Sequence, residues 1–133
     1  MVEANDNKGF AYEDNKLEGA CAISACCILF GGTLFFELKD DNGKKQLQFD
    51  GSFGGIGVGG FTALGYAWFS EDADWLVNYS KNEKISFQLV GGGFGAGTVE
   101  ITWFEGSKWI GSAVCGGAAA GGMTVMGEGR FSK

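Results

Sequence analysis

Short segments with a two-residue hydrophobic period fill the chain from Leu17 onward, and clusters of Gly, Asn and Asp separate them. Apolar and polar residues alternate in 85–89, a pattern typical of a strand with one buried face. Two acidic residues followed by Asn42-Gly43 are a strong hairpin signal. The predicted strands lie at 34–38, 47–50, 85–89, 99–103, 109–115 and 119–131, with turns at 40–43, 91–97 and 105–108. A strand about every ten residues favours an all-β sandwich or a closed barrel.

Glycine occupies 25 of the 133 positions, and proline occupies none. A disordered chain is excluded because 45% of the residues are hydrophobic and 14% are aromatic. The glycines gather at 51–60 and 116–129, where they would weaken a flat strand but permit sharp bends in a small barrel. The two glycine-rich strands are either neighbours, or each crosses a corner of the barrel. The absence of proline fits strands that are paired on both sides.

One glycine-rich segment, 55–60, matches the G-x-G-x-x-G pattern of dinucleotide sites. Such a site needs a helix after the glycines, so that the helix N-terminus faces the pyrophosphate. The residues that follow, 61–66, have the pattern of a strand instead. We therefore interpret these glycines as structural.

A single segment, 70–78, breaks the strand rhythm and predicts a short helix. Ser70 is a good N-cap residue, and three carboxylates follow it in the first turn, at the positive end of the helix dipole. We expect this helix to plug or cross one end of the barrel, with Trp75 and Leu76 as its buried residues.

The length predicts one domain, residues 17–133, preceded by a flexible polar tail, residues 1–16. The start of the chain is acidic and lacks the positive region and apolar run of a secretory signal. The most apolar run, 20–32, is too short to span a bilayer as a helix. Two locations stay open: secretion, if a leader has been removed, and the cytoplasm otherwise.

Histidine is absent, which excludes Ser-His-Asp and Cys-His catalysis and His-ligated zinc. The net charge of −6 and the lack of a basic cluster argue against nucleic acid as a partner. We expect no metal and no cofactor, and we expect a monomer. Acid pairs are the only plausible catalytic groups, namely Asp72 with Asp74 and Glu100 with Glu105. Nothing in the sequence marks a cleft between two such carboxylates, so we predict that the protein is not an enzyme.

Four cysteines, Cys21, Cys26, Cys27 and Cys115, contain no C-x-x-C pair, so neither a zinc nor a redox motif is present. Three of them lie in the apolar run, where cysteine usually behaves as a small hydrophobe. We predict buried, reduced thiols. The alternative is a disulfide between Cys115 and one of the other three, if the protein is exported.

Aromatic residues offer the best candidates for an exposed contact surface. Trp103 shares a strand face with Val99 and Ile101 and is predicted to lie in the core. Trp109 and Phe94 lie beside turns, and Phe53 lies in the glycine-rich stretch. We predict that Phe53, Phe94 and Trp109 contact a membrane or a ligand.

Several motifs together resemble the rhodococcal virulence-associated proteins, the Vap family. They begin with F-D-G-S-F-G-G at 49–55 and continue with Gly60, Ala63-Leu64, Gly65, Trp68, Leu76, I-S-F-Q at 85–88, Trp103-Phe104, Gly111 and the glycine-rich last strand. The resemblance covers roughly 17–131. It implies a compact antiparallel Greek-key β-barrel of eight strands, with one short helix and no ligand tunnel.

The resemblance also implies a function without catalysis. Members of that family are secreted by an intracellular pathogen and disturb the maturation and acidification of the host phagosome or lysosome, through contact with membranes or lipid. We therefore predict a non-enzymatic effector that acts at host endolysosomal membranes or lipid, or on a host protein. The alternative is a protein- or glycan-binding barrel without membrane activity. The four cysteines depart from the family pattern.

Overall fold

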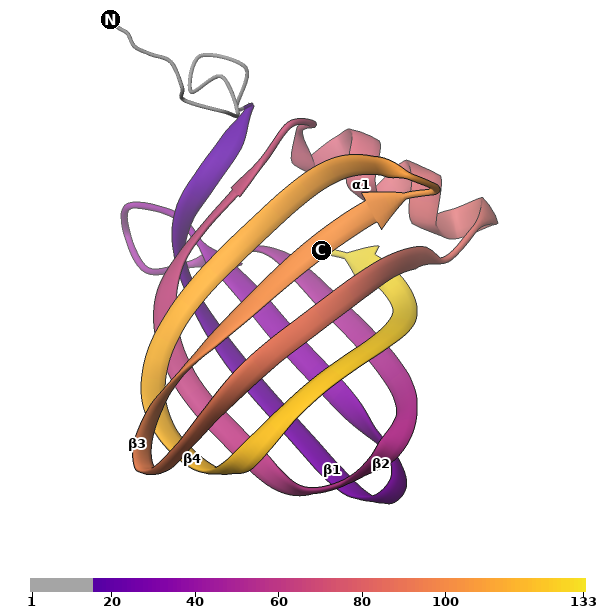
Figure 1. The fold of residues 1–133 in the computed structure, drawn as a ribbon. Helices are drawn as coiled ribbons and strands as arrows, with labels where there is room; N and C mark the ends of the chain where they lie inside the picture. The colour runs from indigo at the N-terminus through magenta and orange to yellow at the C-terminus, as the bar shows by residue number, and fades with distance from the viewer. Residues whose placement is uncertain (1–15) are drawn as a thin grey trace, which may run out of the picture.

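A computed structural model describes residues 16–133, apart from the side chains of 27–30, 55–58 and 123. The predicted tail, 1–16, thus lies outside the described residues except for Lys16. Four long strands and one helix make up the domain (Figure 1). They are β1 (Leu17–Lys39), β2 (Lys45–Phe69), α1 (Ala73–Asn82), β3 (Ile85–Glu105) and β4 (Lys108–Ser132). The fold is all-β with one short helix, as the sequence predicts.

The strands form one antiparallel sheet in the order β1-β2-β4-β3. The sheet rolls into a barrel because β1 and β3 each fold back on themselves. In β1, an ideal Cβ placed on Gly19 would lie 2.6 Å from the Lys39 carbonyl oxygen, so the two ends of this strand touch. In β3, a Cβ on Gly97 would lie 2.2 Å from the Gly92 carbonyl oxygen. The result is an antiparallel β-barrel that surrounds one core (Figure 1).

The expectation of eight separate strands is wrong, because the barrel consists of four continuous strands of 21 to 25 residues. The predicted strands 109–115 and 119–131, for example, are both parts of β4. Glycine-rich backbone of β3 and β4 stays paired through the bend, so that ladder does not end where the strands change direction. The β2–β4 ladder skips residues 55–59 of β2 and resumes at Gly60. The Greek-key connections stay a prediction.

Two predicted hairpin turns are confirmed. Between β1 and β2, the Asp40 carboxylate accepts hydrogen bonds from the backbone N–H groups of Asn42 (2.8 Å) and Lys44 (2.9 Å). Gly43 has a φ of 81°, which glycine adopts without strain. Gly106 has a φ of 65° in the turn between β3 and β4. The third predicted turn, 91–97, lies at the bend within β3.

The two glycine-rich strands are neighbours. Gly51 pairs with Gly129, and Phe53 pairs with Gly127. A Cβ on Gly127 would lie 2.1 Å from the Ser52 carbonyl oxygen, so β2 and β4 approach more closely than any side chain would allow. The G-x-G-x-x-G segment lies within β2, and this strand continues to Phe69 without a helix. The dinucleotide motif is therefore structural, as predicted.

Aromatic rings fill the core near the helix. Trp103 is fully buried, and its ring centroid lies 4.7 Å from that of Phe36 and 5.1 Å from that of Phe69. Phe49 and Phe131 pack against the same ring. This confirms Trp103 as a core residue.

The helix lies at one end of the barrel, but its boundaries differ from those predicted (Figure 1). The N-cap is Asp72, whose side chain accepts a hydrogen bond from the Trp75 N–H (2.8 Å), and not Ser70. The helix also continues to Asn82, beyond the expected end at 78. Leu76 is fully buried as predicted, whereas Trp75 is only partly buried. Asp72 is the N-cap because its carboxylate reaches the free N–H groups of the first turn, whereas Ser70 lies two residues further from them along the chain.

Two hydrogen bonds from β4 hold the helix against the barrel. Ser80 is the buried polar residue of α1, and its hydroxyl accepts from the Phe131 N–H (2.9 Å). The Arg130 guanidinium donates to the Ser80 carbonyl oxygen. The helix is therefore a packed part of the barrel.

Candidate functional site

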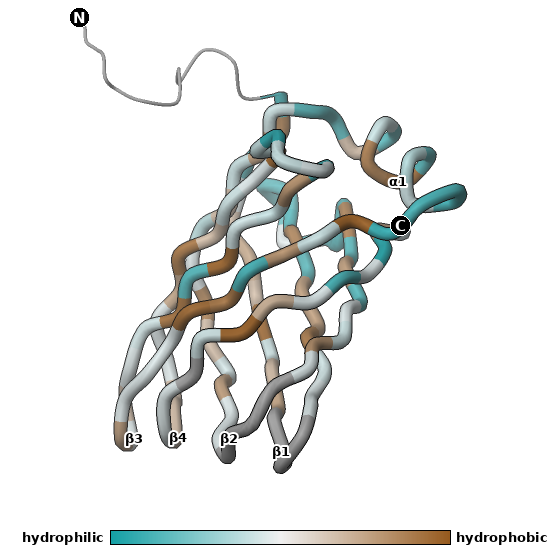
Figure 2. The backbone as a smooth tube through the Cα atoms, turned by 45° about the vertical axis from the view of Figure 1, so that its right-hand side comes forward, coloured by the Kyte–Doolittle hydropathy of each residue, from teal (hydrophilic) through white to brown (hydrophobic). Residues whose placement is uncertain are grey.

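The charged residues gather at one end of the barrel. The sequence has no charged residue in 19–36, 51–70, 85–99 or 109–127, and each of these stretches contains the central bend of one strand. Because the four strands bend at the end opposite α1, their uncharged centres meet there (Figure 1). Hydrophilic residues accordingly lie mainly near α1 (Figure 2). We call the bends near 28–31, 54–60, 92–97 and 120–123 the glycine-rich end, and the opposite end the helical end.

Among the side chains that the structure describes, Phe94 is the most exposed large hydrophobic residue at the glycine-rich end. Its side chain is 93% exposed. It pairs with Ala120, which in turn pairs with Gly60, and Gly60 pairs with Cys26. One aromatic ring therefore projects from a row of small residues that crosses all four strands. A shallow surface depression beside it is lined mainly by small residues, among them Ser24, Cys26, Thr62, Gly95, Ala118 and Ala120.

An apolar outer wall continues from this end toward the middle of the barrel. Leu64 is 71% exposed, and Tyr66, two residues further along β2, is 47% exposed. Val114 is the β4 partner of Tyr66 and is also exposed. Side chains two residues apart on a strand share a face, so these three form one apolar patch.

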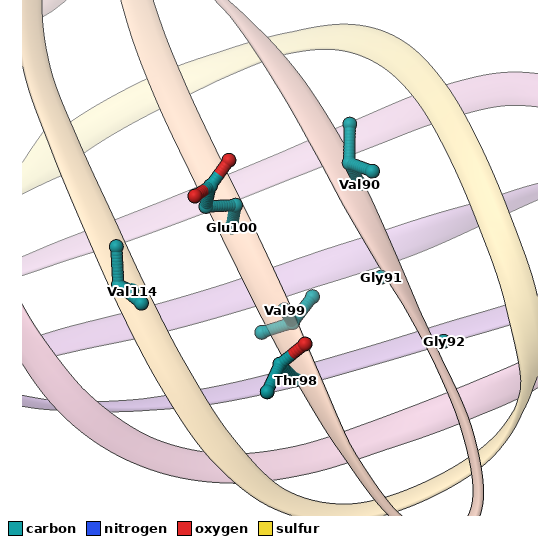
Figure 3. Close-up of a pocket in the computed structure, with 7 residues that line it drawn as sticks. All are labelled: Val90, Gly91, Gly92, Thr98, Val99, Glu100 and Val114. Carbon is teal, nitrogen blue, oxygen red and sulfur yellow. The ribbon is translucent and has the colours of Figure 1, made fainter.

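A shallow groove borders this wall on the side of β3 (Figure 3). Val90 and Val114 lie on either side of Glu100 in it, and Thr98 lies next along the strand. Gly91 and Gly92 leave room on one side. Glu100 is exposed, as the alternating pattern predicts. The groove thus offers one carboxylate between apolar side chains.

The three predicted contact residues lie in different environments. Phe94 is exposed, as expected. Phe53 is only 5% exposed and packs against Phe87 in the core, so it is not a surface contact. Its strand position points inward because the alternation 49, 51, 53 continues the buried face of Phe49. Trp109 is half-buried, and its indole N–H donates to the Ser112 hydroxyl (2.8 Å). The functional roles of Phe94 and Trp109 stay predictions.

The signal that sequence reasoning missed is the position of the charges. The glycine content indicates where the strands bend, whereas the four uncharged stretches indicate which end of the barrel lacks charged side chains. The exposed residues Leu64 and Val114 were missed for another reason. Both lie in strands whose two faces are almost equally apolar in sequence, so the outer face does not stand out.

The acid pair Asp72 and Asp74 has structural partners at the helical end. Asp72 caps the helix, and the Asp74 carboxylate accepts a hydrogen bond from the Lys133 ammonium group. That hydrogen bond and the positive charge of Lys133 lower the pKa of Asp74. Glu105 ends β3 at the hairpin, five residues from the groove carboxylate Glu100.

Two cysteines face each other inside the barrel wall. The Sγ atoms of Cys21 and Cys115 lie 3.4 Å apart, and both residues are buried and reduced. Cys26 is also reduced but exposed, which corrects the expectation that it is buried. The side chain of Cys27 lies outside the described residues. Hydrogen bonding from Cys21 lowers the pKa of the Cys115 thiol, and the same hydrogen bond together with burial raises the pKa of Cys21.

Among the described residues, no group of three or more His, Cys, Asp or Glu side chains is placed to hold a metal ion. Likewise, no helix in this part of the chain is long and apolar enough to cross a membrane.

The protein is an antiparallel β-barrel with an uncharged, glycine-rich end and one helix at the other end. No family model matches the sequence, and no curated protein does either. Solved structures do match. Virulence-associated protein VapB from the intracellular pathogen Rhodococcus equi has a TM-score of 0.64 at 18% identity, over 88% of this chain and 97% of that one. VapD from the same organism has a TM-score of 0.63 at 20% identity, over 87% and 97%. The fold is therefore Vap-like, which confirms the resemblance at the level of the barrel.

Proposed function

We propose that this protein is a non-enzymatic β-barrel effector that contacts lipid membranes through its glycine-rich end, with Phe94 as the side chain that enters the lipid. One observation carries the proposal: a 93% exposed phenylalanine projects from an end of the barrel where the bends of the four strands contain no charged residue. The fold is similar to that of VapB and VapD, virulence-associated proteins of an intracellular pathogen, which supports an effector role. We place this role at host endolysosomal membranes.

The distribution of charge favours this end over the rest of the surface. Removing a charged group from water costs several kcal/mol, so a barrel approaches the apolar part of a bilayer best with an uncharged surface. The ion pairs near the helix, such as Lys108 with Glu71 (3.8 Å), lie at the far end and stay in water. The orientation therefore needs no charge to be buried.

The strength of binding is expected to be modest. Burial of one phenylalanine side chain contributes about 1.5–3 kcal/mol. The net charge of −6 repels anionic lipid at neutral pH. Protonation of carboxylates at acidic pH lowers this repulsion, so binding to anionic vesicles should rise as the pH falls.

Co-sedimentation with vesicles tests the proposal. The full chain is mixed with phosphatidylcholine vesicles and with vesicles that also contain phosphatidylglycerol, at neutral pH and at about pH 5. Phe94→Ala should weaken binding by about tenfold or more. Phe35→Ala is the matched control, because Phe35 is partly exposed but pairs with Asp50 in the charged half of the barrel. Absence of binding in all four conditions would remove the proposal, and equal losses in both variants would remove the assignment to this end.

A second candidate is a protein- or glycan-binding barrel, favoured by the groove around Glu100. There a carboxylate that can accept hydrogen bonds from hydroxyl groups lies between Val90 and Val114. A glycan-array signal that is lost in Glu100→Gln and kept in Phe94→Ala would favour this function over membrane contact.

A further inference from the structure

Cys21 and Cys115 belong to different strands, with one strand between them. Cys21 on β1 pairs with Gly65 on β2, and Gly65 pairs with Cys115 on β4. A Cβ placed on Gly65 would lie 2.6 Å from the Cα atom of Cys115. The missing side chain of Gly65 therefore lets β4 come close enough for the two sulfur atoms to approach to 3.4 Å.

The two thiols lie within hydrogen-bonding distance of each other in the barrel wall. Both are almost fully buried, at 3% and 2% exposed. Either sulfur can be the donor of the hydrogen bond between them. With Cys21 as the donor, the bond stabilises a thiolate at Cys115 and lowers the pKa of Cys115. The thiolate is the form of cysteine that reacts with oxidants. Cys115 is therefore the sulfur expected to react first, with Cys21 as its immediate neighbour.

We propose that Cys21 and Cys115 are an oxidisable pair that forms an intramolecular disulfide and ties β1 to β4 across β2. A small neutral hydroperoxide is the oxidant class that suits a buried pair. The Cys115 thiolate attacks one peroxide oxygen, the O–O bond breaks, and the product is a sulfenic acid together with one water after protonation. The Cys21 sulfur then attacks the sulfenic sulfur, and the sulfenic oxygen leaves as a second water. Two thiols are oxidised to one disulfide, and one hydrogen peroxide is reduced to two waters.

The other cysteines are less well placed for this reaction. Cys26 is exposed and lies five residues further along β1, where its row contains Gly60 and Ala120 rather than Cys115. It can react with oxidants but has no thiol beside it in that row. A test of the Cys21–Cys115 pair must therefore replace Cys26 and Cys27, so that neither thiol can react with the oxidant.

The variant Cys26→Ser/Cys27→Ser isolates the pair in the full chain. The folded variant is treated with hydrogen peroxide, the remaining thiols are alkylated, and trypsin is added. Cleavage at Lys16, Lys39, Lys108 and Arg130 places Cys21 in the fragment 17–39 and Cys115 in the fragment 109–130. We expect a linked pair of these fragments that separates on reduction. The melting temperature should rise on the order of 10 °C in the oxidised form and return with a dithiol reductant, because the disulfide closes a long loop.

Two controls keep the outcome decisive. Cys115→Ala in the same background should give no linked fragments and no rise in melting temperature. The second control is hydrogen peroxide treatment of the protein unfolded in urea. If the native geometry brings the two thiols together, the disulfide should form faster in the folded protein than in the unfolded one. An oxidised variant with both thiols still free to alkylation, or with Cys115 oxidised to a sulfinic acid instead, would overturn the proposal. Neither result depends on membrane binding.

Discussion

The helical end and the glycine-rich end of the barrel are built from different residues. At the helical end, Trp103 and its aromatic neighbours fill the core, and the helix is held by Ser80 and by ion pairs. At the glycine-rich end the bends are rich in glycine, and the side chain of Phe94 points outward. The difference teaches that the fold depends mainly on one end, whereas the other end is free to present an uncharged surface. Four predictions test this division, from the largest expected effect to the smallest.

The first prediction compares the same kind of substitution at both ends. Trp103→Ala should lower the free energy of unfolding by about 3–5 kcal/mol, because it opens a cavity among Phe36, Phe69 and their neighbours. Phe94→Ala should change it by less than about 0.5 kcal/mol, because the ring is exposed. Urea denaturation measures both.

Trp103→Phe is the control for the first prediction. The buried Trp103 N–H has no hydrogen-bond partner within the described residues. Phenylalanine removes that unpaired donor and keeps most of the ring, so the loss should stay below about 1.5 kcal/mol. A loss in Phe94→Ala as large as that in Trp103→Ala would break the comparison between the ends.

The second prediction separates two glycines near the glycine-rich end. Gly127→Ala should lower the free energy of unfolding by about 1–3 kcal/mol, because its Cβ would meet the Ser52 carbonyl oxygen at 2.1 Å and β2 would have to shift. Gly54→Ala is the matched control, since nothing lies within 4 Å of its Cβ. It should be neutral, or stabilising by up to about 1 kcal/mol through the unfolded state. Equal effects at both positions would contradict close approach of the strands as the reason for glycine at Gly127.

The third prediction concerns the N-terminus of the helix. Asp72→Ala should lower the free energy of unfolding by about 1 kcal/mol, because the Trp75 N–H loses its acceptor. Asp41→Ala removes the same charge from the exposed β1–β2 turn and should have a smaller effect. Thermal melts of the two variants, compared at one ionic strength, decide whether the loss belongs to the cap or to charge alone.

The fourth prediction has the smallest expected effect and depends on pH. The pKa of Asp74 is lowered in the folded protein by Lys133, so this pair stabilises the fold above the pKa of the unfolded aspartate. The contribution is lost as the pH falls through the lowered pKa of the folded state. Asp74→Asn should therefore reduce stability slightly at neutral pH, and the difference from the wild type should vanish at strongly acid pH. Both groups are exposed, so high salt should also reduce the difference.

Much of the fold could be predicted from the sequence because its signals are local. Alternation of apolar residues predicted the strands, and Asn42-Gly43 predicted a turn that needs a positive φ. A short helix was predicted in the correct part of the chain, but its N-cap was placed at Ser70 instead of Asp72. Several capping residues stand in a row there, and packing of Leu76 into the core selects among them.

The candidate site was only partly predictable. Phe94 stands beside a turn and is exposed, as its position indicates. Phe53 has a similar glycine-rich context but lies in the core, because strand register decides which face it occupies. No local signal brings Cys21 beside Cys115, since 94 positions separate them.

The sequence by itself determined the strands, the turns and the four uncharged stretches, since these follow from alternation, backbone preference and the order of charges. The tertiary structure decided that each strand continues through its bend, and that the four uncharged stretches meet at one end. It also decided that Gly65 leaves room for two sulfur atoms to meet. The physical reason is that a rolled sheet brings distant residues together through register and curvature, and both are set by the close packing of all four strands around one core.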